Sequence, residues 1–403
     1  MEKKVCVYTI CRDETPAYII RWCKSVSSAD CIIVLDTGST KRETKEALIE
    51  AIECNKITKL YFDNIDPMDF SVARNKALYY SMKHLETNNL INKNTDWVFV
   101  TLDFDEVLQE DGIERIVEEW DGNSYDCMEL IGITKIVVDE VETTSSQSVY
   151  HKIHSANFHW NRRVHEIIVS NDPNKTEKDW KIKKTDIFYE HYQDKSKHRD
   201  YYKLLQLSYI KDGDKSVKNF TYLVWEAYLH NEMEVMFLYA TKGLERCKNN
   251  KDDEFFRDGQ YLICLLRFRA IYYKFKEDYK KEYQELQECI KLIETGIYQP
   301  VRIILLDIAR CVWHIDKYKS IYYYHQFFDI NAEEDCWLEN YDLYKVESLA
   351  MVYDELSTAY YYTGNMFAAL LYSKKAMNYN LNNEQIIKNY EFIVNKIENP
   401  DTI

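Results

Sequence analysis

Strand-like sequence stops near residue 200, and this change limits the possible fold more than any other feature of the chain. Before it, short β-rich runs alternate with polar segments that have helical spacing. After it, the segments are long and amphipathic, 25 of the 34 tyrosines lie there, and the only prolines are Pro300 and Pro400. A chain of 403 residues with this division predicts two domains, 1–200 and 201–403.

The first half predicts an α/β domain. The candidate strands are 4–10, 31–36, 59–63 and 97–103, and the candidate helices between them are 16–29, 41–53 and 71–85. Alternating strands and helices predict a mostly parallel sheet covered on both faces. Residues 127–170 read as strands without helices, which predicts antiparallel strands added at one edge of a mixed sheet.

The second half predicts an all-α domain. Residues 356–377 carry Leu356, Tyr360, Gly364, Ala369 and Ala376 at the offsets of one tetratricopeptide helix pair. Residues 222–244 are a looser copy, with Asn231 at the turn. The small residues would let the two helices of a pair approach each other, and the aromatic rings would fill the adjacent grooves. A packed tetratricopeptide-like array is therefore the favoured interpretation of the tyrosines, although such arrays also offer concave surfaces to peptides.

Composition narrows the function classes. With 46% hydrophobic and 30% charged residues the chain predicts a globular protein, and no run approaches the ~18 apolar residues of a membrane span. The apolar run before Arg12 is too short for a signal peptide, so we expect a cytoplasmic protein without a membrane partner. Eleven cysteines without CxxC spacing argue against disulfides and structural zinc, and a net charge of −15 argues against nucleic acid.

Polar residues follow each strand of the predicted parallel sheet. Ligands of open α/β sheets bind at the carboxyl ends of the strands. The residues at these ends are Thr9, Arg12, Asp13 and Glu14 after the first strand, Asp36 to Thr40 after the second, Arg74 beyond the third, and Asp103 and Asp105 after the fourth. Each group alone is typical of a helix cap or a turn. Together they predict one crevice around Asp36, Arg74, Asp103 and Asp105.

The stretch "WVFVTLDFDEVL" (97–108) runs from a buried strand into acidic residues. Asp103 and Asp105 are two apart, so on an extended strand they would face the same way and repel each other. A divalent cation relieves that repulsion, and oxygen ligands suit Mg²⁺ or Mn²⁺. Such a metal can bind the diphosphate of a nucleotide, with Arg74 as an additional cation for phosphate.

Several linked motifs resemble family 2 inverting glycosyltransferases, which have the GT-A fold, a Rossmann-like nucleotide-sugar domain. The motifs are "VYTICRDE", "CIIVLDTGSTKRET", "FSVARNKAL", "TLDFDEVL" and "RRVHEIIV", in this order and at similar spacing. The stretch at 186–207 resembles the segment that leads into tetratricopeptide helices in one subgroup. That subgroup resembles the peptide S-glycosyltransferases that modify bacteriocins. The resemblance covers residues 4 to about 207.

The resemblance implies roles for individual residues. Asp36 would recognise the base, with Thr9 and Glu14 in the same pocket, and Arg74 would lie near the diphosphate. Asp103 and Asp105 would form the metal-binding DxD pair. His191 would be a further metal or phosphate ligand. Two positions depart from the pattern. Lys41 replaces the usual acidic residue, and Gln193 replaces the usual glycine near His191.

His165 and Glu166 are the remaining active-site candidates. In one interpretation Glu166 is the general base that takes the acceptor proton, and His165 orients the acceptor or contacts the departing phosphate. In the other, both are strand-end residues hydrogen-bonded to the scaffold. The histidines at 151, 154 and 159 alternate with apolar residues. We expect them on the surface of a strand, with metal binding as the alternative.

The resemblance implies an inverting enzyme that transfers a hexose, with glucose as the first expectation, from a UDP-sugar to a Cys or Ser of a peptide. A saccharide or cell-wall polymer is the alternative acceptor. A non-catalytic peptide-binding module, in which the helical half recruits a partner, is the third hypothesis. The expected cofactor is Mg²⁺ or Mn²⁺, the expected partners are UDP-glucose and an acceptor peptide, and a homodimer is an open possibility.

Overall fold

The chain divides into two compact units, Met1–Asp212 and Gly213–Ile403. The structure is a computed structural model and describes residues 2–91, 95–138, 141–192, 201–249, 259–295, 302–330, 346–380 and 382–399. We expected the helical domain to begin at residue 201. Helix α5 (Tyr201–Ile210) instead belongs to the first unit, together with the sheet.

The first unit is built on a mixed sheet with the strand order β3-β2-β1-β4-β7-β6-β11-β5. Its parallel half consists of β1 (Glu2–Cys11), β2 (Cys31–Asp36), β3 (Lys59–Phe62) and β4 (Thr95–Thr101). Cys11 pairs with Asp36, and Tyr8 pairs with Thr101. The ends of β1, β2 and β4 therefore lie at one edge of the sheet, which confirms the predicted parallel arrangement.

The other half of the sheet is partly antiparallel. Strand β7 (Val141–His154) pairs antiparallel with both β4 and β6 (Cys127–Val138), as expected for this region. Two features were not expected. Strand β11 (Phe188–Tyr192) runs parallel to β6 and antiparallel to β5 (Glu106–Leu108), and β10 (Ile182–Lys183) also pairs with β6. Strands β8 (Phe158–Asn161) and β9 (Ile167–Ser170) form a separate two-stranded sheet.

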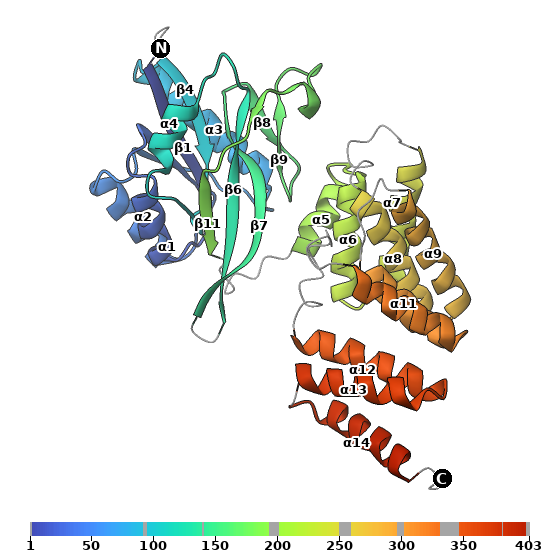
Figure 1. Cartoon of the computed structure of the whole chain (residues 1–403). Coiled ribbons are helices and arrows are strands. Elements are labelled where there is room, and N and C mark those ends of the chain that lie inside the picture. The colour runs from blue at the N-terminus through green and yellow to red at the C-terminus, as the bar shows by residue number, and fades with distance from the viewer. Residues whose placement is uncertain are drawn as a thin grey trace. The chain divides into compact units, whose positions relative to one another are not determined.

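Alternation along the strands separates two apolar layers. Val5 and Val7 of β1 pack with α1 (Pro16–Ser25), α2 (Arg42–Glu53) and α4 (Gly112–Glu119). Cys6 and Tyr8 point to the opposite face and pack with α3 (Phe70–Thr87). The sheet is thus covered by helices on both faces (Figure 1). A short 3-10 helix, Glu177–Asp179, lies between β9 and β10.

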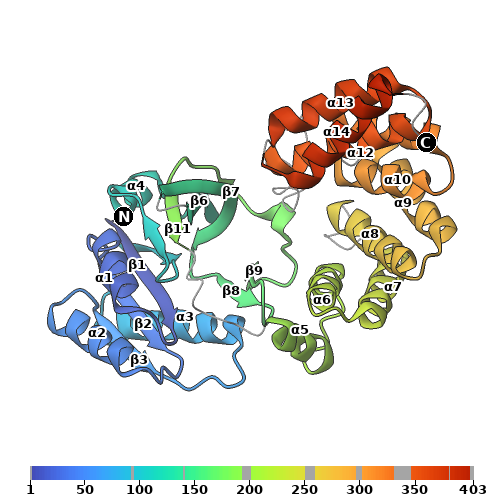
Figure 2. The ribbon, with the colours of Figure 1, turned by 90° about the horizontal axis from the view of Figure 1, so that it is seen from below.

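The second unit, within its described residues, is all helical. Its helices are α6 (Val217–Leu229), α7 (Met233–Asn249), α8 (Gly259–Phe275), α9 (Tyr279–Glu294), α10 (Arg302–Trp313), α11 (Lys317–Asp329), α12 (Val346–Tyr362), α13 (Met366–Tyr379) and α14 (Glu384–Glu398). Neighbours in sequence pack on each other. Figure 2 shows this for α12, α13 and α14, which lie side by side.

Both predicted helix pairs are confirmed. Asn231 lies in the turn between α6 and α7 with φ of 59°, and Gly364 lies between α12 and α13 with φ of 81°. These left-handed conformations suit asparagine and glycine, which adopt positive φ more readily than other residues. Ala369 and Ala376 are fully buried, which lets the facing helices approach closely.

No helix among the described residues is long and apolar enough to cross a lipid bilayer.

Candidate active site

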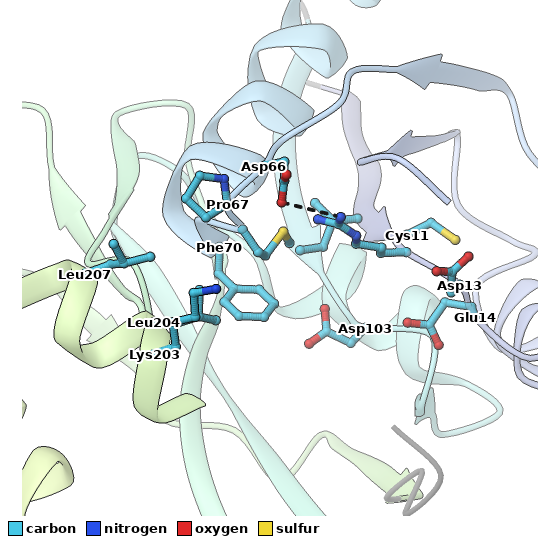
Figure 3. A pocket seen from close by; sticks show the side chains of 13 residues that line it. Cys11, Asp13, Glu14, Asp66, Pro67, Phe70, Asp103, Lys203, Leu204 and Leu207 are labelled. Carbon is cyan, nitrogen blue, oxygen red and sulfur yellow. Dashed lines mark ion pairs between the residues drawn. The ribbon is translucent and has the colours of Figure 1, made fainter. Parts of the chain in front are cut away.

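A cavity of about 480 Å³ lies in the first unit, beyond the carboxyl end of β1. Acidic and apolar residues both line it (Figure 3). Cys11, Asp13, Glu14 and Asp103 lie toward one end, and Pro67, Phe70, Leu204 and Leu207 lie toward the other. Ile10, Arg12, Asp66, Met68 and Lys203 complete the lining. A volume of this size is within the usual range for a small-molecule site.

The turn after β2 is held by Asp36, one of the predicted nucleotide-binding residues. Its Oδ1 accepts hydrogen bonds from the backbone N–H groups of Gly38 (3.0 Å) and Ser39 (2.7 Å), and the residue is almost fully buried. Thr9 is also fully buried, within β1. Neither Asp36 nor Thr9 lines the cavity, whereas Glu14 does. Asp36 therefore holds the turn after β2 and does not itself line the cavity.

Asp13 lines the cavity, whereas Asp36 does not. It has a positive φ of 54°, and its carboxylate accepts from the backbone N–H groups of Thr40 (2.6 Å) and Lys41 (2.8 Å). Burial alone would raise the pKa of Asp13, but these two hydrogen bonds lower it overall. Asp13 is thus an ionised group that ties the end of β1 to the "DTGST" turn.

Arg74, on α3, joins two candidate residues that are far apart in the sequence. Its Nε donates to Glu166 at 2.6 Å, and its Nη2 donates to Asp103 at 2.9 Å. Its Nη1 donates to Thr101 at the end of β4. The guanidinium also lies 5.3 Å from the ring of Trp160. Burial would lower the pKa of Arg74, but the charges of Asp103 and Glu166 raise it overall. Arg74 is a buried cation shared by two carboxylates.

Asp103 and Asp105 do not lie on an extended strand, which corrects our expectation. Strand β4 ends at Thr101, and residues 104–105 form a turn before β5. The two carboxylates accordingly have different neighbours. Asp103 is paired with Arg74, and Asp105 Oδ2 lies 3.6 Å from Nε2 of His191. The argument that a metal is needed to relieve their repulsion therefore fails here, because Arg74 already compensates Asp103.

Beneath this turn lies a buried ion pair that the sequence did not reveal. Lys152 Nζ donates to both carboxylate oxygens of Glu106 at 2.7 Å, and Glu106 Oε2 accepts from the backbone N–H of Asp103. Burial raises the pKa of Glu106 more than Lys152 lowers it. The pair fixes the turn that carries Asp103 and Asp105. Glu106 directly follows the DxD motif, but nothing in the sequence indicated its partner on β7.

Asp105 and His191 are the residues that could hold a metal. Burial would lower the pKa of His191, but hydrogen bonding to Asp105 and its charge raise it overall. Among the described residues, no three His, Cys, Asp or Glu side chains are grouped as a metal site. Two protein ligands fit a Mg²⁺ or Mn²⁺ ion that takes its remaining ligands from water and substrate phosphates. Asp105 and His191 are thus compatible with a Mg²⁺ or Mn²⁺ ion whose coordination is completed by water and by substrate phosphates.

His165 and Glu166 lie in the loop between β8 and β9, and Glu166 directly precedes Ile167, the first residue of β9. His165 has a positive φ of 53°, and its ring stacks on Tyr201 of α5 with centroids 6.1 Å apart. Arg163 anchors the loop through Asp69 and Asp212. The loop thus presents Glu166 to Arg74, and it contacts Tyr201 at the start of α5 and Asp212 beyond the end of that helix.

The histidines of β7 and β8 differ in environment. His154 is fully buried, not on the surface as expected, because β7 lies between β4 and β6. It lies 2.8 Å from the hydroxyl of Tyr8, and burial lowers its pKa to about 4. His159 is exposed and contacts Asn171, and His151 is half-buried near Glu129 and Glu177.

Comparisons with protein-family models and with curated proteins gave no match. Solved structures match over the helical part of the chain. They include a crystal structure of the MamA protein, at 11% identity and a TM-score of 0.34, covering 46% of this chain and 84% of that one. A second is BtubC (BKLC) from P. vanneervenii, at 15% identity and a TM-score of 0.37, covering 49% and 80%.

Proposed function

We propose that the chain is an inverting glycosyltransferase that moves a hexose from a UDP-sugar to a Cys or Ser side chain of a peptide, such as a bacteriocin precursor. The motif resemblance motivates the proposal. The structural observation that supports it most is the Arg74 fork. It brings Asp103 and Glu166, from two separate motifs, to the carboxyl edge of the sheet, where Asp103 also lines a cavity of about 480 Å³.

The donor would occupy the cavity beside Asp13, Glu14 and Asp103. Asp105 and His191 would hold Mg²⁺ or Mn²⁺, which when bound stabilises negative charge on a departing diphosphate. Arg74 has its donors directed to carboxylates, so we assign it to positioning Asp103 and Glu166 instead of binding phosphate. This assignment replaces the role that the resemblance implied for Arg74.

Glu166 is the proposed general base. Its carboxylate accepts the proton of the acceptor thiol or hydroxyl as the sulfur or oxygen forms its bond to the anomeric carbon. The bond from that carbon to the phosphate oxygen breaks, and UDP leaves with the electron pair. Attack and departure on opposite sides invert the anomeric centre. His165, in the same loop, is the proposed acceptor-orienting residue.

The donor half of the proposal is tested by UDP binding with and without Mn²⁺. We expect UDP to bind the full chain more tightly with Mn²⁺, and Asp105→Asn to lose at least about tenfold of that affinity, equivalent to about 1.4 kcal/mol. Glu110→Gln is the matched control, because Glu110 is an exposed carboxylate five residues away. Titration calorimetry measures the affinities.

Absence of UDP and UDP-glucose binding in either condition would contradict the proposal and favour the non-catalytic module. If Mn²⁺ strengthens UDP binding equally in Asp105→Asn and in the wild type, Asp105 is not a metal ligand, but the rest of the proposal stands. The Arg74 fork makes this comparison necessary, because the carboxylates are compensated without a metal and their presence alone does not require one.

The catalytic half is tested by Glu166→Gln. We expect transfer to a Cys- and Ser-containing peptide to fall by roughly 10²–10⁴, the usual contribution of a general base, while UDP affinity stays unchanged. Mass spectrometry of the peptide after incubation with several UDP-sugars measures transfer and identifies sugar and acceptor residue. Wild-type transfer by Glu166→Gln would exclude Glu166 as the base. Transfer to saccharides in preference to peptides would support the alternative acceptor.

A further inference from the structure

A second cavity, of about 570 Å³, lies within the helical unit. Residues of α8, α9, α10, α11 and α12 line it, together with His314 between α10 and α11. Aromatic side chains form part of the wall, including Trp313, Tyr324 and Tyr362, and the ring of Tyr279 stacks on His314 at 4.2 Å. The proposed reaction uses none of these residues.

Two carboxylates in the lining each have an oxygen without a hydrogen-bond donor among the described residues. Glu282 is only 3% exposed, and its Oε2 is buried and unpaired. Asp354 Oδ2 accepts from Asn389 at 2.7 Å, but its Oδ1 is buried and unpaired. A buried carboxylate oxygen without a donor is costly, so both groups would gain from a ligand that supplies N–H or O–H.

Three of the other charged groups of the cavity, Arg310, Glu355 and Lys317, are already engaged. Arg310 donates to Glu355 through Nε (3.0 Å) and Nη2 (2.8 Å), and the Tyr324 hydroxyl donates to the same carboxylate. Lys317 Nζ lies 5.3 Å from the ring of Trp313 and 5.1 Å from that of Tyr362. Lys274 also lines the cavity, but its charge lowers the pKa of Glu282 only in part, so Glu282 and Asp354 are the lining carboxyl groups that keep an unpaired oxygen. The aromatic wall already accommodates one ammonium chain, that of Lys317.

The titration behaviour of the two acids agrees with this geometry. Burial raises the pKa of Glu282 to about 7 and the pKa of Asp354 to about 6. Lys274 and Cys311 lower the pKa of Glu282 only in part, and Asp307 raises it. Asn389 lowers the pKa of Asp354, and Glu355 raises it. A cation bound nearby would favour the ionised form of both carboxylates.

We propose that this cavity binds an alkylammonium or guanidinium group, with its N–H groups donating to the unpaired oxygens of Glu282 and Asp354 and its aliphatic part against the rings of Trp313 and Tyr362. A lysine or arginine side chain of a peptide carries such a group, and so does a free polyamine. This inference is independent of the proposed transfer reaction.

The test uses the full chain and a defined pair of peptides. The probes are N-acetyl-Ala-Lys-Ala amide and the same peptide with its lysine Nε-acetylated, titrated calorimetrically near physiological salt. We expect the first to bind and the acetylated form to bind at least about tenfold more weakly, since acetylation removes the charge and two donors. Equal binding of both peptides would overturn the proposal, and so would the absence of binding by the peptides and by spermidine alike.

Two variants locate the binding. Glu282→Gln and Asp354→Asn keep the side-chain size and remove one charge each, and each is expected to weaken Ala-Lys-Ala binding about tenfold or more. Glu288→Gln is the matched control, because Glu288 is an exposed carboxylate on the same helix as Glu282. Equal weakening by Glu288→Gln would mean that the net charge of −15 attracts the peptide, and would contradict the site.

Thermal unfolding of each variant separates loss of the site from loss of the fold. Both substitutions remove a buried acid of raised pKa, so we expect unchanged or higher melting temperatures at neutral pH. Spermidine provides the other source of the same chemistry. If it binds more tightly than the peptide and loses affinity in both variants, the site is confirmed as a small-polyamine site. Unchanged peptide affinity in two folded variants would exclude it.

Discussion

Arg74 is the residue on which the geometry of the candidate site depends most. Its side chain is 7% exposed and shared by Asp103 and Glu166. Removing one partner of a buried ion pair costs about 3–5 kcal/mol, because the other charge stays buried without compensation. Replacement of Arg74 would therefore disturb both carboxylates together. For this reason the proposed function is better tested at Asp105 and Glu166 than at Arg74.

Glu282 makes the stability of the helical unit depend on pH, and the direction of that dependence follows from its raised pKa. Burial raises the pKa of Glu282 from 4.5 to about 7, so the folded chain holds a proton that the unfolded chain releases. The resulting stability is fully present below about pH 4.5 and is lost as the pH rises through about 7. The difference corresponds to on the order of 3 kcal/mol. Relative to wild type, Glu282→Gln should thus gain stability from pH 5 to pH 8.

Urea unfolding at both pH values measures this difference. The control is again Glu288→Gln, whose carboxylate is exposed, and for which we expect the same pH profile as wild type. Parallel pH profiles for wild type and Glu282→Gln would show that Glu282 does not hold the extra proton. Lys274, Asp307 and Cys311 surround the carboxyl group and are unchanged in both variants.

At the residue scale, the local sequence identified which residues belong to the site, but it did not predict which of them contact each other. Asp103, Glu14 and Glu166 follow recognisable patterns and lie at or beside the cavity. The pairing of Arg74 with both Asp103 and Glu166 joins positions 29 and 92 residues apart. No local pattern contains such a contact. His154 was misplaced for the same reason, because its burial depends on β4 pairing with β7.

Gly243 shows how closely the helices of the second unit approach. A Cβ at this position of α7 would lie 2.8 Å from Leu265 Cδ1 on α8 and 3.1 Å from Phe220 Cβ on α6. We expect Gly243→Val to destabilise the helical unit by about 1–3 kcal/mol through overpacking, although valine has a better helix propensity than glycine. Circular dichroism during chemical denaturation measures the change.

Glu245→Val is the control for Gly243→Val, because Glu245 is exposed on the same helix. We expect a change within about 0.5 kcal/mol there, the usual range for surface substitutions. A Gly243→Val variant as stable as wild type would show that the helices separate without cost, and that a small residue is not needed at this position.

At the element scale, prediction succeeded where a strong periodic run had a clear end. Strand β2 was predicted at its observed bounds, and α1, α2 and α3 lie within a few residues of the predicted ranges. The short strands β5, β10 and β11 were not predicted, because two to five residues carry too little periodicity. Helix α5 was predicted as a helix, but its place beside the sheet depends on tertiary contacts of Tyr201 and Leu204.

The whole molecule consists of two units, and the cavity near β1 belongs entirely to the first. We expect a fragment of residues 1–212 to bind UDP like the full chain, because it retains Lys203, Leu204 and Leu207. A fragment of residues 1–200 lacks this wall and the Arg163–Asp212 ion pair, and should bind UDP at least about tenfold more weakly. Calorimetry on both fragments measures the affinities.

The 1–212 fragment should also lose transfer to peptides more than it loses UDP binding, if the helical unit contributes to acceptor recognition. Equal loss of both activities would instead show that the two units act as one cooperative body. Equal UDP binding by the 1–200 and 1–212 fragments would show that α5 is not part of the donor site.

At the scale of the whole molecule, the sequence predicted the class of both halves correctly. A mixed α/β sheet precedes an all-helical region, because strand and helix periodicities differ over long segments. The position of the division was harder to predict. A helix that packs on a sheet has the same local pattern as one that packs on other helices, so α5 gave no sign of which unit it joins.

The position of α5 also has a consequence for how the protein is made. Translation delivers the ends of β1, β2 and β4 early, but Leu204 and Leu207 are among the last residues of their unit to leave the ribosome. Until α5 has been synthesised, the sheet lacks one wall of its cavity, and the apolar side chains of Met68 and Phe70 remain uncovered. The proposed binding of a nucleotide would therefore begin only after α5 has emerged and docked, when most of the following helices have yet to be synthesised.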